Sequence, residues 1–152
     1  MEYIQANKDE PEEASCIFCR IRDGGEPERV LTRSLLGFVV LNKFPYSPGH
    51  LLIVPNRHEG DVEELSDEET LDLQRLVQRS VKALREESAP HGFNIGMNLG
   101  AVAGAGLPDH LHWHVVPRWC GDTNFMPVVG QTRVMPELLE ESARRLKPRF
   151  EP

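Results

Sequence analysis

His110-Leu-His112-Trp-His114-Val-Val116 is the most informative segment of this 152-residue chain. Histidines alternate with apolar residues in it, and this period of two predicts a strand with all three imidazoles on one face. Residues two apart on a strand are separated by roughly 6.6–6.8 Å, so the outer histidines lie about 13–14 Å apart. That span is too long for one tetrahedral ion held by all three. A polar sheet face is the plainer alternative, but half of the chain's 6 histidines lie here, which favours a site that divides its tasks among them.

A glycine-rich loop lies directly before this segment, at Asn98-Leu-Gly100-Ala-Val-Ala-Gly104-Ala-Gly106. Glycines let backbone N–H groups approach an anion closely, so such a loop can bind phosphate without positively charged side chains. Glycine-rich connections are usually simple turns, and the loop alone indicates no ligand. Its place beside a row of imidazoles favours a phosphate site.

The remaining pattern predicts an α+β fold. Strand-like runs at residues 30–34 and 37–42 indicate a hairpin, and further strands are expected at residues 50–54, 93–99 and 110–116. The early strands are joined by too little chain for crossover helices, so they pair antiparallel. We expect a sheet of about five strands.

A long helix is expected over residues 66–88. Ser66-Asp-Glu-Glu69 is a capping box, the residues after it are apolar at helical spacing, and Pro90 and Gly92 end the pattern. This helix packs on one face of the sheet. A second helix is expected over residues 136–146.

Charge excludes several classes of partner. Lys and Arg total 17 and Asp and Glu total 24, so the net charge of −7 attracts neither nucleic acid nor an anionic membrane. The acidic N-terminus does not resemble a signal peptide, and no apolar run is long enough to cross a bilayer. We expect a cytoplasmic protein with a flexible tail at residues 1–15 and one domain over residues 16–152.

Cys16 and Cys19 form a C-x-x-C pair, and Cys120 stands apart. Without an export signal, such a pair indicates metal or redox chemistry sooner than a disulfide. Its two thiolates are half of a tetrahedral zinc site. A reduced pair that remains from a lost site is the alternative.

The histidine segment resembles the signature of the histidine triad proteins, a family of nucleotide hydrolases and transferases. Four further segments follow in the family's order: Leu41-Asn42, Pro48-Gly49-His50, Pro55-Asn-Arg-His58 and His114-Val-Val-Pro-Arg118. The resemblance covers roughly residues 16–118, and residues 119–126 are similar to the bacterial branch of diadenosine tetraphosphate phosphorylases and hydrolases. It implies a homodimer of histidine-triad-like domains.

The resemblance also implies a function. The chain would act as a hydrolase or nucleotidyltransferase at the α-phosphate of dinucleoside polyphosphates, with diadenosine tetraphosphate as the model substrate. His112 would attack the phosphorus and form a covalent nucleotidyl-histidine. His114 would hydrogen-bond the phosphate and the bridging oxygen. His50 would orient the triad, although a histidine satisfied by its own turn is an equal alternative.

Other positions follow from the same resemblance. Asn42 would contact the ribose, and the phosphate would meet Asn98 and the loop at Gly104 and Gly106. A nucleoside phosphoramidate hydrolase and a slow-turnover nucleotide-binding regulatory module are the alternative functions. Whether a divalent ion such as magnesium accompanies the substrate stays open.

Family members with this C-x-x-C complete a structural zinc site with two histidines. One lies at the end of the central strand and the other is the first of the triad. The resemblance therefore implies one zinc per chain, bound by Cys16, Cys19, His58 and His110.

Overall fold

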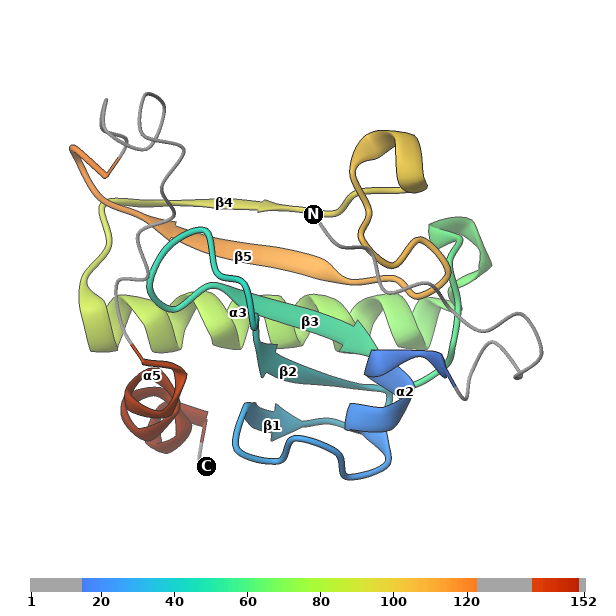
Figure 1. The fold of residues 1–152 in the computed structure, drawn as a ribbon, viewed down its shortest axis with the longest axis horizontal. Helices are drawn as coiled ribbons and strands as arrows, with labels where there is room; N and C mark the ends of the chain where they lie inside the picture. The colour runs from blue at the N-terminus through green and yellow to red at the C-terminus, as the bar shows by residue number, and fades with distance from the viewer. Residues whose placement is uncertain (1–14, 123–137, 151–152) are drawn as a thin grey trace.

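The computed structural model describes residues 15–122 and 138–150 (Figure 1). Its strands are β1 (Val30–Arg33), β2 (Gly37–Leu41), β3 (Leu51–Pro55), β4 (Gly92–Gly96) and β5 (Trp113–Arg118). They form one sheet in the order β1-β2-β3-β5-β4, and every neighbouring pair is antiparallel. The expected α+β fold with a five-stranded antiparallel sheet is confirmed.

The long helix α3 (Asp67–Ser88) crosses one face of the sheet (Figure 1). Ser66 caps it through the expected capping box, since its side chain accepts from the Glu69 N–H and the Glu69 carboxylate accepts from the Ser66 N–H. The helix lies very close to β2 at Gly37. A Cβ there would be 2.7 Å from a methyl carbon of Leu73, so only glycine permits this approach.

The alternation along the strands divides the buried side chains between two faces. One cluster packs Val39, Leu51 and Val115 against α3. The other packs Phe38 and Leu52 against the short helix α2 (Ile17–Arg22). Because His114 pairs with Leu52 across β3 and β5, it belongs to the α2 face.

The histidine segment is less regular than expected. The strand predicted over residues 110–116 begins only at Trp113, so His110 and His112 precede β5. The ladder with β3 ends at the pair of Ile53 and Trp113, and the ladder with β4 ends at the pair of Gly96 and His114. Beyond these pairs neither neighbouring strand continues the backbone ladder, so the chain leaves the sheet.

Other boundaries also shifted. The strand expected over residues 93–99 is β4, which ends at Gly96, and short 3-10 helices occur at Val62–Glu64, Ala101–Ala103 and Lys147–Phe150. Helix α2 was not expected. Helix α5 (Leu139–Leu146) falls within the helix predicted over residues 136–146, of which residues 136 and 137 lie outside the described residues. The tail prediction, apart from Ser15, lies outside them too.

None of the helices in the described parts of the chain is both long and apolar enough to span a membrane.

Candidate active site and metal centre

Cys16, Cys19, His58 and His110 come from three distant parts of the chain and meet in one cluster. Their ligand atoms all lie within 4.8 Å of one another. Cys16 Sγ is 3.3 Å from Nδ1 of His110, and Cys19 Sγ is 3.3 Å from Nδ1 of His58. Tetrahedral zinc, with Zn–S near 2.3 Å and Zn–N near 2.0–2.1 Å, separates sulfur and nitrogen ligands by about 3.5 Å. The residues therefore fit zinc in donor type and spacing.

The protonation of His110 also suits a metal. Its Nε2 lies 2.9 Å from the carbonyl oxygen of Pro55, which can only accept, so Nε2 carries the hydrogen. The lone pair is then on Nδ1, which faces the two cysteines. Burial lowers the pKa of His110 to about 4, which keeps the ring neutral at pH 7. A neutral imidazole held by a carbonyl is the usual form of a ligating histidine.

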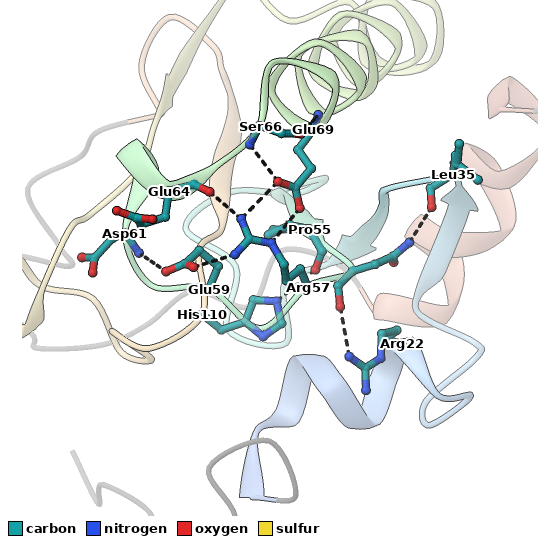
Figure 2. Close-up of polar contacts among 11 residues, drawn as sticks. Arg22, Leu35, Pro55, Arg57, Glu59, Asp61, Glu64, Ser66, Glu69 and His110 are labelled. Atoms are coloured by element: carbon teal, nitrogen blue, oxygen red, sulfur yellow. Dashed lines mark hydrogen bonds and ion pairs between the residues drawn. The ribbon is translucent and has the colours of Figure 1, made fainter.

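An ion-pair network fixes the turn that carries His58 (Figure 2). Nε and one terminal nitrogen of Arg57 donate to the Glu69 carboxylate at 3.0 and 3.1 Å, and the other donates to Glu59 at 2.7 Å. The backbone carbonyl of Glu59 accepts from the Leu111 N–H at 2.6 Å. Arg57 thus connects the start of α3 to the turn of His58, and Glu59 connects that turn to the histidine segment.

His112 lies beside the Cys and His cluster, and one of its ring nitrogens makes a hydrogen bond. Its Nδ1 is 2.9 Å from the backbone carbonyl of His110, so Nδ1 carries the hydrogen and Nε2 carries the lone pair. The Phe18 ring packs against it, with centroids 5.1 Å apart. Burial lowers the pKa of His112 below its ordinary value. The result is a neutral imidazole with a nucleophilic nitrogen.

His50 and His114 form a hydrogen-bonded pair whose direction can be assigned. The backbone N–H of Tyr46 donates to Nδ1 of His50, so the hydrogen of His50 is on Nε2. That atom is 2.9 Å from Nδ1 of His114, which must accept. The hydrogen of His114 is therefore on Nε2, a buried atom with no partner among the described residues. His50 thus accepts a hydrogen bond from its own turn and also donates to His114, which is compatible with both alternatives for it.

Burial keeps this pair uncharged. Burial, with a smaller contribution from the neighbouring histidines, lowers the pKa of His50 to about 3 and that of His114 to about 4. At neutral pH His114 therefore offers a neutral N–H donor rather than a charged imidazolium.

Asn42 and Asn98, two of the other expected nucleotide contacts, make hydrogen bonds within their own loops. Asn42 lies near His50, with its Nδ2 3.3 Å from the His50 Nδ1, while its Oδ1 accepts from the Phe44 N–H. Asn98 donates to the carbonyl of Gly104 at 3.3 Å and, within the described residues, makes no hydrogen bond to the histidines. A Cβ added at Gly106 would have no neighbouring atom within 4 Å.

Two aromatic residues beside the histidines were not anticipated. Phe18 lies between the two cysteines of the C-x-x-C, and its spacing from Ile21 is an apolar signal for α2. The Tyr46 ring centroid is 4.9 Å from that of His50 and 6.1 Å from that of His114. Tyr46 sits in a turn cluster, where nothing in the sequence marks it.

The sequence of the chain matches a known protein family. The family model of the HIT domain matches residues 24–120, most of the described part. The chain belongs to the histidine triad family. This confirms the resemblance on which the site residues were chosen.

Curated relatives of this histidine triad protein include enzymes. It is 46% identical over 117 residues to an AP-4-A phosphorylase of Mycobacterium tuberculosis, which covers 77% of this chain and 60% of that protein. The chain thus spans about three-fifths of the length of that relative. It is 36% identical over 104 residues to an adenosine 5'-monophosphoramidase of Schizosaccharomyces pombe, covering 68% of this chain and 74% of the relative.

A solved structure shares both fold and family. The crystal structure of a zinc-bound histidine triad family protein from Mycobacterium smegmatis superposes with a TM-score of 0.75 at 31% identity. The match covers 90% of this chain and 94% of the other.

Proposed function

We propose that this histidine triad protein is a nucleotide hydrolase or nucleotidyltransferase that acts at the α-phosphate of dinucleoside polyphosphates. The observation that carries the proposal is that two neighbouring neutral imidazoles present opposite groups at Nε2, a lone pair on one and a hydrogen on the other. His112 has a lone pair on Nε2, and the neighbouring His114, with ring centroids 5.2 Å apart, has a hydrogen on Nε2. The similarity to an AP-4-A phosphorylase supports this class of substrate.

The reaction proceeds in two displacements. In the first, Nε2 of His112 forms a bond to the α-phosphorus while the bond to the bridging oxygen breaks, and the electron pair leaves with that oxygen. The Nε2–H of His114 donates a hydrogen bond to the leaving oxygen as charge develops. In the second, water or inorganic phosphate attacks the phosphorus and breaks the N–P bond, which restores His112.

The metal centre has a supporting role in this proposal. Cys16, Cys19, His58 and His110 hold one zinc per chain, which when bound supplies a structural crosslink between α2 and the histidine segment. The carbonyl of His110 holds the Nδ1 proton of His112. The cluster thereby sets the orientation of the nucleophile two residues later.

Replacing the nucleophile tests the mechanism. His112→Asn removes the attacking nitrogen, so turnover of diadenosine tetraphosphate should fall at least about 10³-fold, or about 4 kcal/mol in barrier. Nucleotide affinity by calorimetry should survive. Wild-type protein quenched during turnover should carry a nucleotide on His112 that is stable to base and labile to acid. The exposed His91, changed to Asn, is the matched control and should leave the rate unchanged.

An adduct on another residue, or near-normal turnover by His112→Asn, would show this mechanism to be wrong. The products distinguish the two acceptors, because water yields AMP and ATP from diadenosine tetraphosphate, whereas phosphate yields ADP and ATP.

A phosphoramidase is the second candidate, supported by the similarity to the Schizosaccharomyces pombe enzyme. The same His112 would attack adenosine 5'-phosphoramidate, with ammonia as the leaving group. The ratio of kcat/KM for this compound and diadenosine tetraphosphate decides between the two. A single burst without further turnover on either would instead indicate the slow regulatory module.

A further inference from the structure

The loop of residues 42–50 between β2 and β3 exposes the ring of Tyr46 to solvent, while hydrogen bonds hold the backbone of the loop in place. The Asn42 N–H donates to the His50 carbonyl, the His50 N–H donates to the Ser47 carbonyl, and the Ser47 hydroxyl donates to the Pro117 carbonyl. Ser47 and His50 are buried, yet Tyr46 between them is 74% exposed. Exposure alone does not mark a ligand surface, since Phe44 of the same loop is 67% exposed. Tyr46 differs in that its ring also lies against His50 and His114.

The covered side of this ring lies over the reaction centre. Tyr46 is nearly parallel to His114, with 19° between the ring planes, and its centroid is also near that of His50. The buried Nε2–H of His114 has no partner among the described residues. Tyr46 therefore borders the atom that donates to the leaving oxygen in the proposed reaction.

The four rings of the site form a continuous row. Phe18 contacts His112 at 5.1 Å, His112 contacts His114 at 5.2 Å, and His114 contacts Tyr46 at 6.1 Å between centroids. The attacked phosphorus meets His112, and the departing chain passes His114. Tyr46 thus lies at the end of the row toward which the leaving group departs, opposite Phe18.

We propose that Tyr46 is a stacking platform for the base of the leaving nucleotide, and so sets a preference for substrates with a second nucleoside. This inference rests on the proposed function and assigns a binding site for its departing half. Any purine or pyrimidine has a π-face, so the platform selects for the presence of a base rather than for its identity.

The test compares two substrates that differ only in the second nucleoside: diadenosine tetraphosphate and adenosine 5'-tetraphosphate. In Tyr46→Leu, kcat/KM for the first should fall at least about fivefold while that for the second stays within about twofold, because only the first has a base to stack. Tyr46→Phe keeps the ring and should keep the wild-type ratio. Phe44→Leu is the matched control, since Phe44 is an exposed aromatic of the same loop without a ring contact to the histidines among the described residues.

Equal losses on both substrates would mean that Tyr46 only shields His50 and His114, and would overturn the inference. An unchanged ratio, or an equal shift in Phe44→Leu, would overturn it as well. In these cases the wild type still cleaves both compounds, so the proposed function stands. If the wild type cleaves neither, the proposed function fails and the inference fails with it.

Discussion

The chemical character of each histidine in the site depends on the atom that its second ring nitrogen contacts. Backbone carbonyls hold the hydrogens of His110 and His112, while a backbone N–H directs the hydrogen of His50 toward His114. Three backbone groups thus give rings of identical covalent structure the different hydrogen positions on which the proposed roles of ligand, nucleophile and donor rest. Burial keeps all of them neutral by lowering their pKa values.

The burial of His50 makes stability depend on pH. Its pKa is about 3 in the folded chain and about 6.5 when unfolded, so the unfolded chain binds an extra proton between these values and stability falls as pH drops below about 6.5. A charge on the neighbouring His114 or His112 would lower this pKa as well. His50→Gln has no titrating group at this position and does not lose this part of its stability on acidification. The amount by which the wild type exceeds the variant in unfolding free energy should therefore fall by up to about 2 kcal/mol from pH 7 to pH 5.

Urea unfolding at the two pH values measures this difference. His91→Gln, at an exposed histidine, is the control and should follow the wild type. A difference between wild type and His50→Gln that is constant or grows on acidification would contradict the assignment of a neutral, buried His50.

At the scale of the element, α2 contacts both the Cys and His cluster and the histidine segment. Its Cys16 and Cys19 face the metal cluster, and its Phe18 packs on both His110 and His112. A six-residue helix is too short to be stable by its own hydrogen bonds. Its place on the sheet therefore depends on the apolar contacts of Phe18 and Ile21 and, in the proposed function, on the zinc.

Removing a ligand should consequently affect the fold more than the chemistry. The purified protein should carry about one zinc per chain, and Cys16→Ala should lose it and lower the melting temperature by at least about 5 °C. The loss in kcat should be proportionally smaller, since Cys16 touches no reacting atom. Metal analysis and scanning calorimetry check both, with the exposed Cys120→Ala as the control. A metal-free wild type with unchanged melting temperature and full activity would refute the zinc assignment.

At the scale of the whole molecule, the sheet has an edge that the described residues leave uncovered. Among the described residues β4 pairs only with β5. Ile95 on this strand and Leu99 after it are about half exposed, and Val102 is fully exposed. Unpaired edge strands with apolar side chains favour pairing with another chain. We therefore keep the homodimer as a proposal and place its contact at this edge.

Sedimentation equilibrium at micromolar concentration should yield about twice the chain mass of 17.2 kDa. Ile95→Lys puts a charge into the proposed contact and should shift the protein toward the monomer. Leu35→Lys introduces the same charge at a side chain that is 86% exposed before β2 and should leave the mass unchanged. A mass of one chain for the wild type excludes the dimer.

The parts of the fold that could be predicted are those with a local cause. The capping box at Ser66 and the apolar stripe of α3 involve residues three or four apart, and the hairpin of β1 and β2 joins adjacent segments. These patterns depend on neighbours along the chain and are visible without a structure. The histidine row, the glycine-rich loop and the C-x-x-C pair are local patterns too, whereas His50, His58 and the individual roles were implied by the family resemblance. The structure brings the four metal-ligand candidates together.

Only the tertiary structure decided what depends on contacts between distant segments. The strand period in residues 110–116 predicted one regular strand, but β5 starts at Trp113 because pairing with β3 and β4 ends there. Helix α2 forms against the sheet, with too few residues for a strong pattern of its own. The hydrogen position on His114 and the place of Tyr46 over its ring arise from groups 64 and 68 residues away along the chain, which no local pattern can encode.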